Sequence, residues 1–131
     1  MSGITAEREA VAELIARDDR PAVAFVLAPV SPPLAMVLPG SPYLEGGETF
    51  GSKTLRIDVW LVYPGATDNA ATSSALDAEI TRTVAALEAD DIFVESVEAP
   101  AVWQPNSGGS FLYTVISARL EISSPTEVPH D

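Results

Sequence analysis

Residues Thr54 to Tyr63 constrain the fold most, because two kinds of side chain alternate along them without a break. One side of this run is hydrophobic at five successive positions: Leu55, Ile57, Val59, Leu61 and Tyr63. The other side mixes polar, charged and apolar groups: Thr54, Arg56, Asp58, Trp60 and Val62. Successive side chains of a strand point to opposite faces of a sheet, so the pattern predicts a half-buried strand. The mixed face fits either a partial cover by a helix or loop, or contact with another subunit, where aromatic anchors are enriched.

Proline and glycine divide the first half of the chain. Ile4 to Arg17 is predicted to form an amphipathic helix with Thr5 as its cap and acids in its first turn. Strand-like runs follow at Ala22 to Ala28 and at Leu34 to Leu38, the second entered from a proline turn. The Gly/Pro-rich segment Gly40 to Ser52 is predicted to be a long loop, either a protruding functional arm or an ordinary hairpin connection.

The strongest helical pattern runs from Thr72 to Ala89. Its apolar residues recur at helical spacing, and Ser74 with Asp77 has the spacing of a capping box. We expect this helix to cover one face of the sheet. Acids are predicted on its outer side and just after it, as a solvated face or as a surface that meets a partner or repels DNA: Asp77, Glu79, Glu88, Asp90 and Asp91.

The last predicted elements are the two arms of a hairpin, Ile92 to Trp103 and Ser110 to Ile122, joined across Gln104 to Gly109. The predicted fold class is therefore α+β: a mostly antiparallel sheet packed against one main helix and a short N-terminal helix, with a long Gly/Pro-rich loop. At 131 residues the chain fits one domain, which we place at residues 1–122, followed by a flexible tail at 123–131.

Composition narrows the classes of function. A net charge of −12 disfavours gripping nucleic acid, which needs clustered Lys and Arg. The absence of cysteine excludes thiol catalysis, disulfides and cysteine zinc sites. No apolar run approaches the roughly 18 residues of a membrane span, and the N-terminus lacks a signal-peptide layout, so we expect a soluble protein with no membrane association.

Catalytic patterns are weak. The sole histidine, His130, lies in the predicted tail, where a catalytic triad or metal site would require that tail to fold back over the domain. The sequence GGETFGSKT resembles a phosphate loop, but its lysine is one position late and a strand follows it. Acid pairs such as Glu95 and Glu98 arise by chance among 19 acids. We predict no catalytic, cofactor or metal site, and a role in binding or assembly.

One family has a similar order of segments. PPLAMVLPGSPY leads through GGETFG to LRIDVWLVY, a helix follows around SSALDAEITRTVAALEA, and FLYTVISARLEI closes the domain. Over residues 4–122 this layout resembles the tail-terminator proteins of long-tailed, siphovirus-type bacteriophages, especially those of actinobacterial hosts. The resemblance implies a small α+β virion protein that closes the growing tail tube with a six-fold ring and presents the surface that joins the filled head.

The partners implied by this resemblance are further copies of the chain in a homo-hexameric ring, the tail-tube protein and the head-side connector or stopper. DNA would pass through the channel without specific binding. The protein would be assembled in the host cytoplasm and would lie at the head-proximal end of the tail. Two other functions remain open: another head-to-tail connector or stopper of the neck, and a non-viral soluble binding module. A small hydrolase using His130 is a remote third.

We hypothesise a division of labour within such a ring. The Gly40 to Ser52 loop and the Gln104 to Gly109 tip would reach neighbouring subunits or the adjoining ring, and Asp90 and Asp91 would face the channel. The candidate subunit-contact residues are Tyr43, Leu44, Phe50, Trp60, Trp103 and Asn106.

Overall fold

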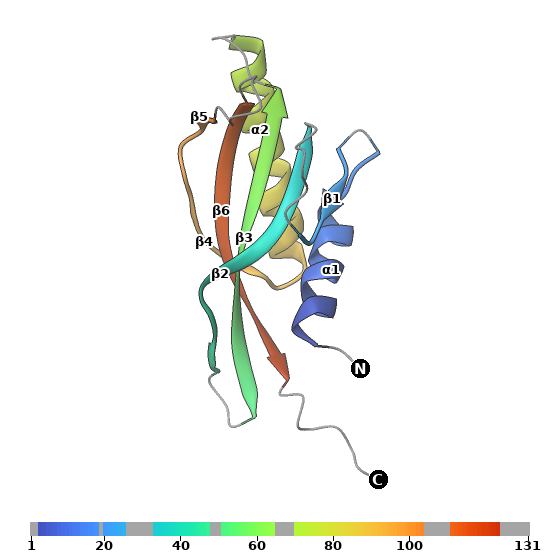
Figure 1. Cartoon of the computed structure of the whole chain (residues 1–131), viewed down its shortest axis with the longest axis vertical. Coiled ribbons are helices and arrows are strands. Elements are labelled where there is room, and N and C mark those ends of the chain that lie inside the picture. The colour runs from blue at the N-terminus through green and yellow to red at the C-terminus, as the bar shows by residue number, and fades with distance from the viewer. Residues whose placement is uncertain are drawn as a thin grey trace.

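A computed structural model describes residues 3–18, 20–25, 33–47, 51–64, 70–103 and 111–123. In this part of the chain, two helices pack on one face of a six-stranded sheet (Figure 1). All strand pairs are antiparallel except the pair of the first two strands. The predicted α+β class, with a mostly antiparallel sheet and two helices, is confirmed.

Three long strands form the middle of the sheet: β2 (Leu34–Gly46), β3 (Ser52–Pro64) and β6 (Phe111–Ser123). The two-residue strand β1 (Ala22–Val23) pairs with β2 in parallel and forms one edge. The other edge consists of β4 (Phe93–Val97) and β5 (Ala101–Trp103), which both pair with β6. The predicted hairpin is therefore confirmed, with its first arm divided into two short strands.

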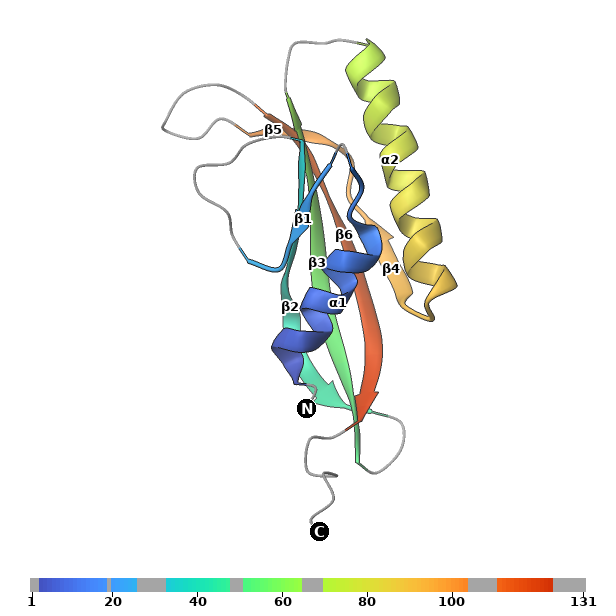
Figure 2. The ribbon, with the colours of Figure 1, turned by 90° about the vertical axis from the view of Figure 1, so that its right-hand side faces the viewer.

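The main core lies between the sheet and the helices α1 (Ile4–Ile15) and α2 (Ala70–Ala89), which cover the same face (Figure 2). Leu55, Ile57, Val59 and Leu61 of β3 are completely buried there, as their alternation predicts. From α2, Leu76 and Leu87 are also completely buried. Each such side chain contributes about 1.5–3 kcal/mol through removal from water, which explains why both helices dock on this face.

The predicted loop Gly40 to Ser52 is wrong over its first half, because β2 continues to Gly46. The register between β2 and β3 shifts between Pro39 and Leu44, so a bulge takes up the residues that carry proline and glycine. A bulge leaves residues out of the hydrogen-bond ladder, and proline lacks the N–H that the ladder needs. The rest of the predicted loop includes residues 48–50, which lie outside the described residues.

Helix starts differ from the prediction. The N-cap of α1 is Gly3, which makes no side-chain capping bond, so Thr5 lies inside the helix. The start of α2 is Ala70, so Ser74 lies within the helix and the predicted capping box is wrong. The predicted strand Ala22 to Ala28 is wrong beyond Val23, because β1 covers only Ala22–Val23 and the chain bends at Ala24 and Phe25. Residues 26–28, like residues 124–131 of the predicted tail, lie outside the described residues.

The acidic outer face of α2 also needs one correction. Asp77, Glu88, Asp90 and Asp91 are exposed, as predicted. Glu79 is only 6% exposed, so its placement on the solvated face is wrong. Its carboxylate forms ion pairs with three arginines. Two of them lie in the turn after α1, far from Glu79 in the sequence.

Candidate functional site

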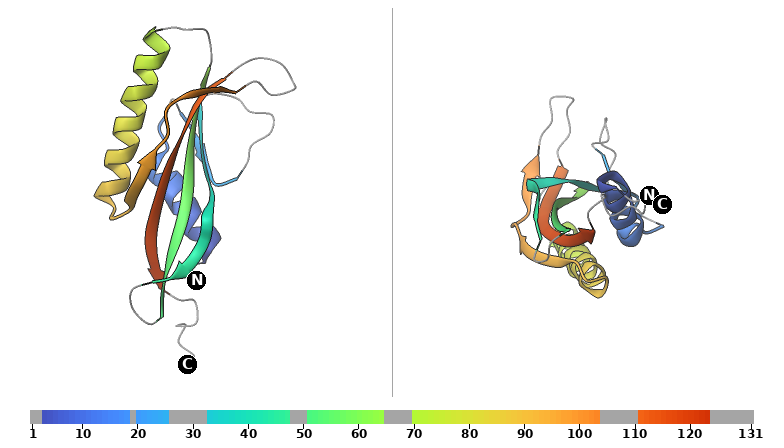
Figure 3. Two further views of the ribbon diagram at one scale, coloured as in Figure 1. Left: turned by 90° about the vertical axis from the view of Figure 1, so that its left-hand side faces the viewer. Right: turned by 90° about the horizontal axis from the view of Figure 1, so that it is seen from below.

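The second face of the sheet is the first candidate surface, and we call it the open face because neither described helix packs on it (Figure 3). Its apolar half is a small cluster of side chains from four strands. At its centre, Trp60 of β3 stacks on Tyr113 of β6 with ring centroids 5.0 Å apart and planes 8° apart. Leu34, Met36 and Val62 are buried beside them. Offset stacking of this kind contributes beyond simple burial and gives the face a rigid aromatic centre.

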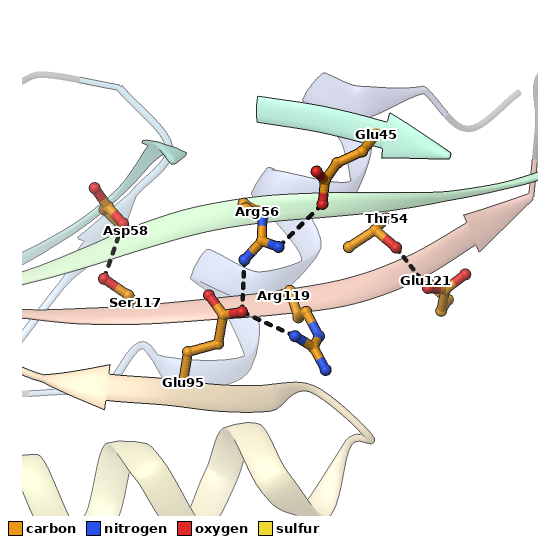
Figure 4. A network of polar contacts seen from close by, with 8 residues as sticks. All are labelled: Glu45, Thr54, Arg56, Asp58, Glu95, Ser117, Arg119 and Glu121. Atoms are coloured by element: carbon orange, nitrogen blue, oxygen red, sulfur yellow. Dashed lines mark hydrogen bonds and ion pairs between the residues drawn. The ribbon is translucent and has the colours of Figure 1, made fainter. Parts of the chain in front are cut away.

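The other half of this face is charged (Figure 4). Arg56 of β3 donates to Glu95 Oε2 at 2.5 Å and to Glu45 Oε1 at 3.0 Å. Arg119 of β6 donates to the same Glu95 oxygen at 2.9 Å. The register shifts between Val94 and Ser96, so Glu95 occupies a bulge in β4. Bulges re-aim side chains, which explains how an edge strand supplies a carboxylate to two arginines of the central strands.

These contacts shift the pKa values of two side chains in the network, Glu95 and Arg56. The hydrogen bond from Arg56 is the main reason that the pKa of Glu95 lies below its ordinary value, with that from Arg119 adding to the effect against partial desolvation. The hydrogen bonds to Glu95 and then Glu45 raise the pKa of Arg56. Glu95 and Arg56 therefore stay charged together across the neutral pH range.

Two polar pairs flank the arginines. Thr54 donates to Glu121 at 2.7 Å, and Ser117 donates to Asp58 at 3.3 Å (Figure 4). Burial raises the pKa of Asp58, and the nearby charges of Glu98 and Glu95 add to this rise while the bond from Ser117 opposes it. The folded structure therefore disfavours the ionised form of Asp58. Its neighbours on the same face of β3, Thr54 and Arg56, have hydrogen-bond partners.

The two edges of the sheet expose different apolar groups. On the β4–β5 edge, Phe93 is 56% exposed and Val102 is 65% exposed, with Val97 also exposed between them. The Phe93 ring lies 4.4 Å from the guanidinium carbon of Arg119, which joins this edge to the charged half of the open face. Beyond β1 at the opposite edge, Phe25 is 55% exposed. Exposed edge strands carry unpaired backbone groups and are ready templates for another chain.

The predicted contact residues lie in different parts of the molecule. Trp60 belongs to the aromatic stack of the open face. Tyr43 packs toward the main core, and its hydroxyl accepts a hydrogen bond from Arg8 of α1 at 2.8 Å. Leu44 is exposed on β2. Trp60 and Tyr43 therefore serve opposite faces of the sheet, and the structure does not bring them together.

Trp103 ends β5 opposite Phe111, which packs on the same apolar cluster as Trp60. Phe50 and Asn106 lie outside the described residues. Asp90 and Asp91 form an exposed turn after α2, with Asp91 in the left-handed region at φ 63°. Aspartate adopts this conformation more readily than most residues, so the backbone of the turn explains the choice of residue at Asp91.

The residues that sequence reasoning missed are the charged partners on the open face: Glu45, Glu95 and Arg119. Arg56 stood on the mixed side of the Thr54 to Tyr63 pattern, but its partners are 11 and 39 positions away. Only the pairing of β2, β3, β6 and β4 brings them together. Glu95 additionally requires a bulge, for which the sequence has no local signal.

Among the described residues, no group of three or more His, Cys, Asp and Glu side chains is placed to hold a metal ion. Neither described helix is long and apolar enough to cross a membrane. Comparison with protein-family models and with curated proteins finds no match.

Proposed function

We propose that this protein is a structural virion component that assembles into a closed ring, caps the phage tail tube and offers the surface to which the head docks. The observation that carries the proposal is the pair of unlike exposed edges of the sheet. One edge presents Phe93, Val97 and Val102, and the other presents Phe25. The resemblance of residues 4–122 to tail terminators supplies the biological setting.

Unlike edges suit a ring. In a cyclic homo-oligomer with more than two subunits, each contact is heterologous: one patch of a subunit meets a different patch of the next. We place the β4–β5 edge of one copy against the β1 edge of its neighbour, so that apolar side chains on both edges leave water together. The stacked Trp60 and Tyr113 lie on the open face between these two edges and keep it rigid.

Charge fits the same role. The net charge of −12 and the exposed Asp90 and Asp91 suit a ring through which DNA slides without sticking. In this proposal the tail-tube protein meets one side of the ring and the head-side connector meets the other.

Two single-edge variants test the ring directly. Phe25→Glu blocks one edge and Val102→Glu blocks the other, and Ala78→Glu on the exposed surface of α2 is the matched control. Light scattering and electron microscopy would follow the wild-type chain and each variant, with and without tail-tube protein. We expect rings of about six subunits from the wild type and the control, and monomers from each edge variant.

Mixing the two edge variants separates a ring from a symmetric dimer. Each retains one intact edge, so a heterologous contact predicts that the mixture forms a dimer of one copy of each and stops there. A wild-type chain that stays monomeric or forms only a two-fold dimer, even beside tail-tube protein, would refute the proposal. Rings that leave tubes uncapped would instead favour a role as another neck component, a connector or stopper.

A further inference from the structure

A pocket of about 240 Å³ lies on the helix-bearing side of the molecule, away from the open face of the sheet. It is formed by the end of α1, the turn that follows it and the C-terminal half of α2. Its lining residues are Leu14, Ile15, Ala16, Arg17, Arg20, Arg82, Thr83 and Ala86. None of the surfaces assigned to ring assembly includes these residues.

Three of the chain's seven cationic side chains gather at this pocket around a single carboxylate. Arg20 Nε lies 3.3 Å from Glu79 Oε1, and Arg17 Nε lies 3.8 Å from Glu79 Oε2. Arg82 donates a short hydrogen bond to the same Oε2. A guanidinium carries five donors and a carboxylate accepts about four bonds, so Glu79 cannot engage every donor of these arginines.

Two of the lining side chains are buried and incompletely paired. Arg20 is 2% exposed; its Nη2 donates to the Ile15 carbonyl at 2.7 Å, but its Nη1 has no hydrogen-bond partner among the described residues. Thr83 is also 2% exposed, and its hydroxyl has no described partner. Buried polar atoms are almost always hydrogen-bonded, so these two atoms require a guest molecule or a water.

The carboxylate of Glu79 is already ionised beside these unpaired donors. Burial opposes its ionisation, but the hydrogen bond from Arg82 and the charges of Arg20 and Arg17 outweigh that effect and hold the pKa of Glu79 below its ordinary value. Glu79 therefore already serves as an anion at neutral pH, and Arg20 Nη1 and the Thr83 hydroxyl are the buried donors left for a second one.

We propose that Arg17, Arg20, Arg82 and Thr83 bind one carboxylate group carried on a short apolar stem. Guanidinium groups bind planar carboxylates through paired hydrogen bonds. The remainder of the lining is aliphatic, from Leu14, Ile15, Ala16 and Ala86, which suits methylene groups next to the carboxylate. The volume lies below the roughly 300 Å³ at which drug-sized ligands begin to fit. A short-chain acid and the side chain of a glutamate from another protein share this chemistry.

Titration of the full-length chain with sodium butyrate tests the site. Two-dimensional NMR would follow the Arg Nε–H signals and the Thr83 methyl, with sodium chloride at equal ionic strength as the baseline. We expect saturable shifts with a dissociation constant on the order of 1 mM. Glutamate blocked at both ends is the second probe: tighter binding than butyrate indicates a protein side chain as the natural guest, and weaker binding indicates a free acid.

Two variants and one control make the assignment specific. Thr83→Val keeps the shape of the side chain, and Arg82→Gln removes one guanidinium from a half-exposed position. Each should weaken butyrate binding about tenfold, and Thr83→Val should do so with no loss of thermal stability. Arg119→Gln, on the opposite face of the sheet, should leave binding unchanged. Shifts that butyrate causes no more than chloride, or that inorganic phosphate causes equally well, would overturn the proposed carboxylate site, because water or any anion then satisfies the buried groups.

Discussion

Arg56 and Arg119 are direct cross-strand partners in the β3–β6 ladder. Like charges placed opposite each other in a sheet are destabilising. One oxygen of Glu95 accepts a hydrogen bond from each of them, so the bulge in β4 supplies the anion that makes the pair tolerable. The edge strand is therefore tied electrostatically to the centre of the sheet, beside the Phe93 side chain that we assign to the ring contact.

Glu95→Gln should lower the free energy of unfolding by about 0.5–1 kcal/mol at pH 7, a modest value because the carboxylate is partly exposed and screened. Since the pKa of Glu95 is depressed below 4.5, its contribution is complete above pH 4.5 and is lost as the pH falls through the folded-state pKa. Urea unfolding at several pH values checks both points. The control Glu88→Gln, exposed on α2, should change stability little, and an equal loss in both variants would contradict the bridging role.

Asp58→Asn should have the opposite sign. The pKa of Asp58 is raised above its ordinary 3.8, mainly by burial, so the folded state holds this proton more tightly than the unfolded state does. Stability from this group therefore falls as the pH rises from below 3.8 through the folded-state pKa. Asparagine keeps an acceptor for Ser117 and should raise the melting temperature at pH 7, with the gain disappearing below pH 3.8. A destabilised Asp58→Asn protein at pH 7 would show that the ionised carboxylate is needed.

Glu79→Gln should be severe, with a loss of about 3 kcal/mol, because it leaves buried Arg20 without its carboxylate partner. The depressed pKa of Glu79 gives the same pH direction as for Glu95: the stabilisation is present above pH 4.5 and is lost on acidification. Thermal or urea unfolding provides the measurement. Asp77→Asn, two positions away and exposed on the same helix, is the control and should cost less than about 0.5 kcal/mol. Similar losses of stability in both variants would contradict a buried ion pair between Glu79 and Arg20.

Two glycines of β2 should respond differently to alanine. A Cβ at position 40 would lie 2.9 Å from the carbonyl carbon of Arg56, whereas one at position 46 meets nothing within 4 Å. Gly40→Ala should therefore cost about 1–3 kcal/mol and displace Arg56 from Glu95, while Gly46→Ala should be neutral or slightly stabilising. Urea unfolding measures the stability, and the Arg56 Nε–H signal in NMR reports its displacement. An unchanged signal in folded Gly40→Ala protein would show that β2 can move away without affecting the network.

Local pattern was sufficient for the elements that are periodic over many residues. The alternation of Leu55, Ile57, Val59 and Leu61 predicted the buried face of β3, and all four side chains are completely buried. The helical spacing of Leu76 and Leu87 predicted the docking face of α2 in the same way. The α+β class followed from the order of these elements, since each must bury one face.

Local pattern failed where the chain departs from a regular period. The prolines and glycines of the Gly40 to Ser52 segment predict a loop, but β2 continues to Gly46 because a bulge absorbs the irregularity. The charge of Glu79 favours the outer face of α2, with the other acids, but Glu79 comes three residues after buried Leu76 and therefore lies near the buried side of the helix. Its burial depends on arginines in the turn after α1, about 60 residues earlier in the chain.

The amino-acid sequence by itself determined the fold class, the main helices and long strands and the buried side of β3, because hydrophobic periodicity is a local property that selects one face of an element for burial. The tertiary structure alone decided which charges meet: Arg56 and Arg119 with Glu95 on the open face, and Arg17, Arg20 and Arg82 with Glu79 beside the pocket. Partner choice among charges depends on strand register, bulges and helix docking, which join residues far apart in the chain, and no local pattern encodes those distances.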